Sequence, residues 1–293
     1  MDRTKIIAGL IAAVVFGAGC SGPRPIVVAS KNFTEQLVLG EIMAQQLERR
    51  LGQKVERKLN LGGTLLAHQA LINGEIDVYP EYTGTALTAI LKLPPSSDAS
   101  KVLEEVRSEY ANRWRVEWLA PFGFNNSFAI VIRGDDARRG RLETLTDAAR
   151  SRTDWAMGAG YEFLQRPDGF AGLVKAYGLH IQGQVKTMDL GLLYRALEQK
   201  QVDMIAAAAT DGMLSVLDVT VLKDDRHYFP PYEAAPVVRQ EALASRRGMR
   251  EALGELAGKL TNQTMQKLNY QVDGKHRSLA EVAREFLAGG TAP

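Results

Sequence analysis

The sequence contains one cysteine, Cys20, so an internal disulfide cannot form. The 4 histidines stand far apart, and none has the spacing of a metal site. Four catalytic or nucleotide-binding patterns are also missing: G-x-x-x-x-G-K-[ST], H-E-x-x-H, C-x-x-C and G-x-S-x-G. These absences predict no catalytic residue, no metal and no cofactor, and they favour a binding protein over an enzyme.

An excess of charge of either sign is missing too. Lys and Arg together number 36 and Asp and Glu 34, which gives a net charge of +2 at pH 7. The densest basic group, Arg246, Arg247 and Arg250, stands beside Glu251 in a helix-like segment and is typical of a solvated helix face. Because nucleic-acid binding needs a concentrated basic surface, we expect no nucleic-acid partner.

The first 20 residues differ from the rest of the chain. Two basic residues precede an apolar run from 6 to 16, and small residues lead from this run to Cys20. The order is typical of an export signal, and the run is short for a permanent membrane span. Residues 1–20 resemble a bacterial lipoprotein signal peptide, except that Gly17 stands where a Leu-like residue is usual. We expect acylation of Cys20 and a lipid anchor on the membrane surface; ordinary secretion and an uncleaved anchor are the alternatives.

Beyond this segment, β-branched or apolar stretches alternate with stretches of helical periodicity. The predicted strands are 25–30, 55–61, 75–80, 127–133, 154–160, 184–188 and 202–209. The predicted helices are 32–51, 65–72, 85–93, 101–113, 145–151, 170–177 and 190–200, with further helices after residue 249. Such alternation predicts the α/β class, with parallel sheets flanked by helices.

Two segments of the chain align with each other without gaps. Residues 69–84, QALINGEIDVYPEYTG, match 195–210, RALEQKQVDMIAAAAT, and the match places Tyr82 opposite Ala208. One interpretation is that two α/β units share a composition. The other is that two similar lobes each present a strand end to a shared crevice, which is where open α/β sheets bind ligands.

Six segments occur in the order that one protein family shows. They are ASKNFTEQLVLGEIMAQQLE from residue 29, LGGTLLAHQALINGEIDVYPEYTGTAL from 61, GFNNSFAIVIR from 123, FLQRPDG from 163, ATDG from 209 and FPPYEAAPVVR from 229. With these, the chain resembles the substrate-binding proteins of ABC importers for glycine betaine, choline and related osmoprotectants. The resemblance covers nearly the whole mature chain. It implies a two-lobed clamshell of the type II periplasmic binding proteins, with lobe one at 26–126 plus 229–293, lobe two at 127–228 and two hinge strands between them.

The resemblance also implies a clamp for the carboxylate of the ligand. A carboxylate needs cationic side chains, hydroxyls or backbone N–H groups. Lys31 in SKNFT, Thr85 in YTGT and Arg166 in LQRPD match the positions that supply these groups in the family. Asn126 and Asp211 match motif positions that we interpret as structural, tying the lobes and capping turns.

The cationic end of such a ligand needs aromatic rings, because a quaternary ammonium has no N–H to donate and is attracted by ring faces. Tyr82 and Tyr232 match two walls of the aromatic cage of the family. Phe128 occupies a wall that is usually Tyr, and Ala208 occupies a second one. Losing one ring costs about 1 to 2 kcal/mol of binding free energy and leaves space beside Ala208.

These residues predict an extracytoplasmic solute-binding protein, expected to be a monomer, that delivers a quaternary-ammonium compound to an ABC permease and its ATPase. The space beside Ala208 leaves two alternatives open, a larger betaine such as ergothioneine and a ligand that is not a betaine. A sensor domain with the same fold is a further alternative. The missing catalytic patterns disfavour an enzyme on this scaffold.

Overall fold

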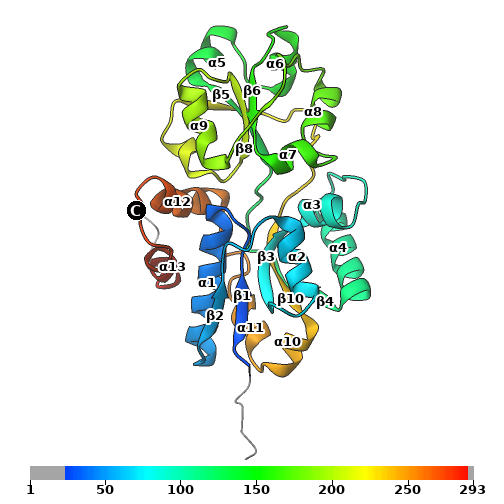
Figure 1. The fold of residues 1–293 in the computed structure, drawn as a ribbon, viewed down its shortest axis with the longest axis vertical. Coiled ribbons are helices and arrows are strands. Elements are labelled where there is room, and N and C mark those ends of the chain that lie inside the picture. The colour runs from blue at the N-terminus through cyan, green and yellow to red at the C-terminus, as the bar shows by residue number, and fades with distance from the viewer. Residues whose placement is uncertain (1–23, 290–293) are drawn as a thin grey trace, which may run out of the picture.

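A computed structural model describes residues 24–289, and in Figure 1 these form two α/β bodies placed end to end. The predicted signal segment and Cys20 lie outside the described residues. The predicted α/β class is confirmed, because each body contains a sheet covered by helices. We use "lobe one" and "lobe two" for the proposed division at 26–126 plus 229–293 and 127–228.

The sheet of lobe one has the strand order β2-β1-β3-β10-β4. Its strands are β1 (Ile26–Ala29), β2 (Val55–Lys58), β3 (Val78–Tyr82), β4 (Val116–Trp118) and β10 (Ala234–Arg239). The sheet of lobe two has the order β7-β6-β8-β5-β9. Its strands are β5 (Phe128–Arg133), β6 (Met157–Ala159), β7 (Lys186–Thr187), β8 (Met204–Ala208) and β9 (Val219–Leu222).

The expectation of purely parallel sheets is wrong. Strands β2, β1 and β3 are parallel, as are β7, β6 and β8, but β10 is antiparallel to β3 and β4, and β5 is antiparallel to β8 and β9. The reason is the path of the chain between the lobes. Strand β5 leaves the junction on entering lobe two, whereas β6 and β8 run towards the junction, and β10 returns from the junction into lobe one (Figure 1).

Helices cover both faces of the lobe-one sheet. They are α1 (Thr34–Leu51), α2 (Thr64–Ile72), α3 (Thr83–Thr85) with the π-helical turn η1 (Ala86–Ile90), α4 (Ala99–Trp114), α10 (Gln240–Ser245), α11 (Met249–Gly254), α12 (Asn262–Asp273) and α13 (Leu279–Leu287). Alternate residues of β1 face opposite sides, as the pleat requires. Ile26 and Val28 join the core beneath α1, while Val27 and Ala29 join the second core beneath α2 and α4.

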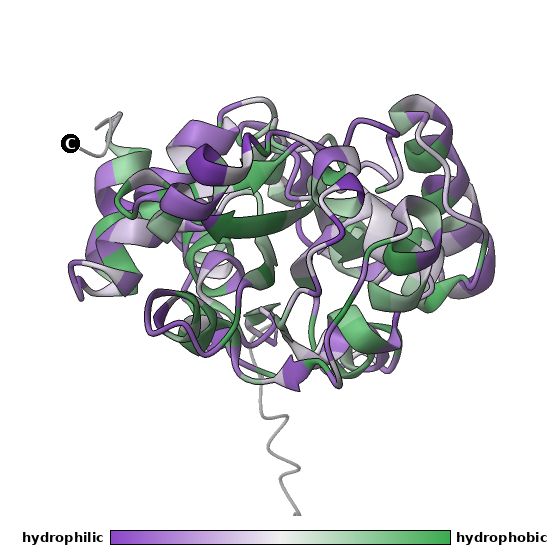
Figure 2. Ribbon diagram, turned by 90° about the horizontal axis from the view of Figure 1, so that it is seen from above, coloured by the Kyte–Doolittle hydropathy of each residue, from purple (hydrophilic) through white to green (hydrophobic). Residues whose placement is uncertain are grey.

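Lobe two is organised in the same way around its own sheet. Its helices are α5 (Gly134–Gly140), α6 (Leu145–Arg150), α7 (Tyr161–Gln165), α8 (Phe170–Tyr177), α9 (Leu190–Glu198) and the 3-10 turn η2 (Gly212–Ser215). Figure 2 shows apolar strands in the interior and hydrophilic segments on many outward helices. Burial of these apolar faces is the main driving force that holds the elements together.

Two chain segments connect the lobes and lie side by side. One links β4 to β5 through Asn125, and the other links β9 to β10 through Glu233, which pairs with Asn125 in an antiparallel bridge. The backbone N–H of Asn126 donates to the carbonyl of Tyr232 at 3.0 Å. Helix α12 adds a third contact, because the side-chain amide of Asn269 donates to the carbonyl of Thr210 at 2.8 Å.

Candidate ligand-binding site

Strand β3 ends at the junction of the lobes, and the segment DVYPEYTGT that contains it is buried throughout. Tyr79 packs in the core of lobe one and donates its hydroxyl to Glu81 at 3.2 Å. Gly84 permits a close approach, since a Cβ there would lie 2.8 Å from the ring of Tyr232 and 2.7 Å from the carbonyl of Pro231. The small residue therefore lets the ring of Tyr232 lie directly against the end of β3.

Arg166 is the centre of a polar cluster that joins the lobes. Its guanidinium donates to Thr85 at 2.8 Å, to Thr88 at 3.0 Å and to the hydroxyl of Tyr232 at 2.9 Å, all in lobe one. It also binds both carboxylate oxygens of Asp168 in its own lobe, at 2.9 and 2.7 Å. Burial lowers the pKa of Arg166, but Tyr232 and Asp168 outweigh this and raise it, so the cation persists. Such a fork is suited to a carboxylate.

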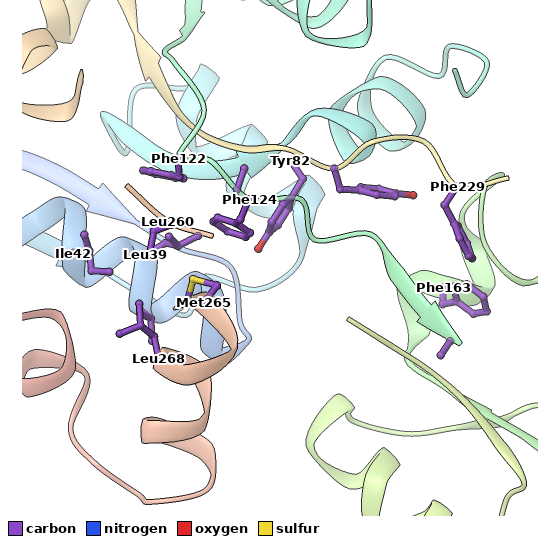
Figure 3. Packing of buried hydrophobic residues seen from close by; sticks show 14 of the residues in the cluster. Leu39, Ile42, Tyr82, Phe122, Phe124, Phe163, Phe229, Leu260, Met265 and Leu268 are labelled. Carbon is purple, nitrogen blue, oxygen red and sulfur yellow. The ribbon is translucent and has the colours of Figure 1, made fainter. Parts of the chain in front are cut away.

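Aromatic rings surround this guanidinium. The centre of the Arg166 guanidinium lies 5.4 Å from the ring centroid of Phe128 and 5.2 Å from that of Tyr232. The ring of Phe128 also contacts Phe163, Phe229 and Tyr232, with centroids 4.8, 5.7 and 5.7 Å away. Figure 3 shows Phe163 and Phe229 facing each other at the lobe-two side of this group, with Tyr82 towards lobe one. The cluster therefore places aromatic rings next to a cation, an arrangement that is mutually attractive.

Ala208 is the direct partner of Phe128 in the antiparallel pair of β8 and β5. Side chains of directly opposed residues share one face of a sheet. Position 208 therefore lies next to the ring of Phe128, as the predicted cage requires, and a methyl group stands there instead of a second ring.

Lys31 forms a second cluster, at the end of β1. Its ammonium lies 2.6 Å from Glu81 and 3.4 Å from the hydroxyl of Thr64, and its side chain is only 2% exposed. It also lies over the ring of Tyr82, 4.7 Å from the centroid, and 5.8 Å from the centroid of Phe33. The structure thus gives Lys31 an internal carboxylate partner, and its role in binding the carboxylate of a ligand stays a prediction.

Glu35, in the first turn of α1, contacts the hydroxyl end of Tyr82. It accepts hydrogen bonds from the hydroxyl of Tyr82 at 2.6 Å, from Asn126 at 2.8 Å, from Asn269 at 3.3 Å and from the hydroxyl of Thr210. Burial raises the pKa of Glu35, and these four donors offset part of the rise. The carboxylate consequently ties the ring of Tyr82 to the hinge and to lobe two.

The two clusters meet through the end of β3, where Tyr82 belongs to one and Thr85 to the other. Glu162 in α7 closes the junction from lobe two, since it accepts the backbone N–H of Thr64 at 3.1 Å. The predicted clamp and cage interleave: each clamp cation, Lys31 and Arg166, lies over rings predicted as cage walls. In this structure the lobes contact each other, and the cations of the protein itself lie against the aromatic faces.

Three acidic residues at the junction, Glu35, Glu81 and Glu162, had no predicted role. Glu35 stands in the first turn of a helix, where a carboxylate is common because it complements the helix dipole. Its contact with Tyr82 spans 47 positions and the one with Thr210 spans 175, so no local pattern signals them. Asn126 donates to Glu35 from the hinge and Asp211 caps η2, while the interpretation of both as structural stays a prediction.

Residues 24–289 contain no group of three or more His, Cys, Asp or Glu placed to hold a metal ion. Within the same range, no helix is both long and apolar enough for a bilayer crossing. A hollow of about 540 Å³ on lobe one, lined by Arg107, Trp118 and Arg250 among others, contains none of the predicted site residues.

Two lobes, each with a mixed five-stranded sheet, and a polar and aromatic cluster between them define a two-lobed binding protein of the type II periplasmic class. The sequence profile described as "Substrate binding domain of ABC-type glycine betaine transport system" matches residues 24–289. The chain belongs to this family, and the predicted membership is confirmed. As a family member it is an extracytoplasmic substrate-binding protein.

Three relatives show how far the likeness extends. The ergothioneine transport permease and binding protein of Helicobacter pylori is 36% identical over 90% of this chain, which spans about half of that relative (47%). The carnitine transport binding protein of Listeria monocytogenes is 33% identical over 92% of this chain and 88% of its own. A crystal structure titled glycine betaine/carnitine/choline ABC transporter superposes with a TM-score of 0.77 at 32% identity, covering 90% of this chain and 98% of that chain.

Proposed function

We propose that this protein binds a small quaternary-ammonium compound between its lobes and delivers it to an ABC permease driven by an ATPase. The observation that carries the proposal is the Arg166 cluster, which joins a guanidinium from lobe two to the hydroxyls of Thr85 and Tyr232 in lobe one. Arg166, Thr85 and Lys31 bind the anionic end of the ligand. Tyr82, Phe128 and Tyr232 face its cationic end.

Closure follows from these contacts. A ligand that touches Arg166 in lobe two and Thr85 in lobe one stabilises the closed arrangement more than the open one. Only the closed form then presents both lobes to the permease. In this scheme the protein is a monomer without catalytic activity or cofactor. Cys20 carries a lipid that holds the protein at the membrane. Mass spectrometry of the mature N-terminus tests whether Cys20 is acylated.

Calorimetry of residues 24–289 tests the ligand class. The panel contains glycine betaine, choline, carnitine, proline betaine and ergothioneine, with glycine and ethanolamine as controls that lack the three methyl groups. We expect at least one trimethylammonium compound to bind at micromolar concentration or below and both controls to bind at least a hundredfold more weakly. Absence of binding to all five would contradict the ligand class and leave the fold untouched.

Ala208 favours a second candidate, a ligand larger than glycine betaine. The methyl side chain lies beside Phe128, at a position where an aromatic wall is usual in the family. The Helicobacter pylori relative, whose name includes ergothioneine binding, is compatible with a ring-bearing betaine. The order of affinities in the same panel separates glycine betaine from a larger ligand such as ergothioneine.

Ala208→Tyr is expected to tighten glycine betaine binding about five- to thirtyfold, because it adds one ring worth roughly 1 to 2 kcal/mol. Calorimetry of the variant measures this change. Val221→Tyr, on the exposed face of β9, is the control and should leave affinity unchanged. If Ala208→Tyr instead weakens glycine betaine and abolishes ergothioneine binding, the pocket accommodates the larger ligand.

A further inference from the structure

Three tyrosine hydroxyls at the junction each donate a hydrogen bond to a buried carboxylate. The pairs are Tyr82 with Glu35, Tyr232 with Asp168, and Tyr79 with Glu81. Two of these tyrosines, Tyr82 and Tyr232, are the proposed aromatic walls. Hydrogen bonds that accept at an ionised group are stronger than neutral ones and polarise their donors.

The three carboxylates differ in their charge partners. Glu81 is paired with Lys31 at 2.6 Å, and Asp168 is paired with Arg166 at 2.7 Å. Glu35 has no ion pair within residues 24–289 and is held by neutral donors alone, including Asn126 and the hydroxyl of Tyr82. Of the three carboxylates, the one that accepts from the hydroxyl of Tyr82 is therefore the one with no cation beside it.

A cation already lies over the face of the Tyr82 ring. The ammonium of Lys31 lies 4.7 Å from its centroid, although Lys31 also has Glu81 as a direct partner. A carboxylate that accepts the phenolic hydrogen adds electron density to the ring and makes its face more negative. The four donors fix Glu35 in place, so its charge stays aligned with the ring.

We propose that Glu35 is a positioning residue that strengthens the attraction of Tyr82 for the cationic group of the ligand, without touching the ligand itself. The proposal rests on the proposed function and extends it. Glu35 supplies the negative potential that selects a positively charged head group over an uncharged group of the same shape. Tyr82 is the ring through which this potential reaches the ligand.

Glu35→Gln tests the proposal with two matched pairs of probes. Choline and 3,3-dimethylbutan-1-ol have the same shape and differ by one positive charge, as do glycine betaine and 3,3-dimethylbutanoate. Glutamine keeps the volume, and Asn126 and Asn269 each have a side-chain oxygen without a partner that could accept from its amide. We expect calorimetry to show about a tenfold loss of affinity for choline and glycine betaine, and less than a twofold loss for each uncharged-head isostere.

A purely structural role of Glu35 would weaken both members of each pair equally, and that result overturns the proposal. Glu285→Gln in α13 removes an exposed carboxylate far from the junction and should change neither pair. If the wild-type protein binds neither choline nor glycine betaine, the proposed function fails and the proposal fails with it. Isosteres too weak for calorimetry are replaced by comparing Tyr82→Phe with Tyr82→Phe plus Glu35→Gln: equal affinity of the two for the tighter-binding cation supports action of Glu35 through the Tyr82 hydroxyl, and a further loss in the double variant overturns it.

Discussion

Replacing Arg166 by methionine is expected to lower the affinity for glycine betaine more than a hundredfold. The substitution removes the guanidinium that joins Thr85 and Tyr232 of lobe one to lobe two. The carboxylate of the ligand then has no guanidinium to bind, and the closed arrangement loses a contact between the lobes. The substitution also leaves Asp168 buried without its cation, and we expect a loss of about 3 to 5 kcal/mol in the free energy of unfolding. Calorimetry and urea denaturation measure the two effects.

A second substitution separates these two effects. Arg166→Met combined with Asp168→Asn removes the uncompensated charge, so it should recover most of the lost stability and none of the lost affinity. Arg138→Met is the surface control, because Arg138 is 60% exposed and water screens its ion pairs. Full affinity for glycine betaine in the Arg166→Met protein would contradict both roles, the contact with the carboxylate of the ligand and the bridge that favours closure.

Local pattern predicted most of the fold. The run at 25–30 became β1, whose alternating residues enter two cores, and the helix predicted at 170–177 has the same bounds as α8. Strands β4, β9 and β10 were not predicted, and the expected parallel direction of β5 was wrong. Strand direction depends on where the chain crosses between lobes, and a short apolar run carries the same period in either direction.

The site was predictable only in part. Family motifs indicated Tyr82, Thr85, Phe128, Arg166 and Tyr232, and the structure brings Phe128, Arg166, Tyr232 and Thr85 into one cluster. The carboxylates behind the site were missed because their partners are 47 or more positions away in the chain for Glu35, and 50 for Glu81 with Lys31. The sequence shows that a carboxylate is present, but which group neutralises or hydrogen-bonds it depends on tertiary contacts.

For Lys31, the tertiary partner changes the expected result most, because the sequence shows the cation but not its buried partner Glu81. Lys31→Met is expected to lower the free energy of unfolding by about 3 kcal/mol, because Glu81, which is fully buried, loses its cation. We also expect about a tenfold loss of affinity for glycine betaine and little change for choline, since only the former carries a carboxylate. Denaturation by urea and calorimetry with both ligands give the two results.

The double variant Lys31→Met with Glu81→Gln decides between the two roles of Lys31. It should restore much of the stability, since no charge is left uncompensated, and the hydroxyl of Tyr79 still has an acceptor at position 81. A loss confined to glycine betaine in this variant would assign Lys31 to the carboxylate of the ligand. Equal affinity of the variant and the wild type for both ligands would show that Lys31 serves only to neutralise Glu81. Lys101→Met, at a lysine 79% exposed in α4, controls for loss of a positive charge.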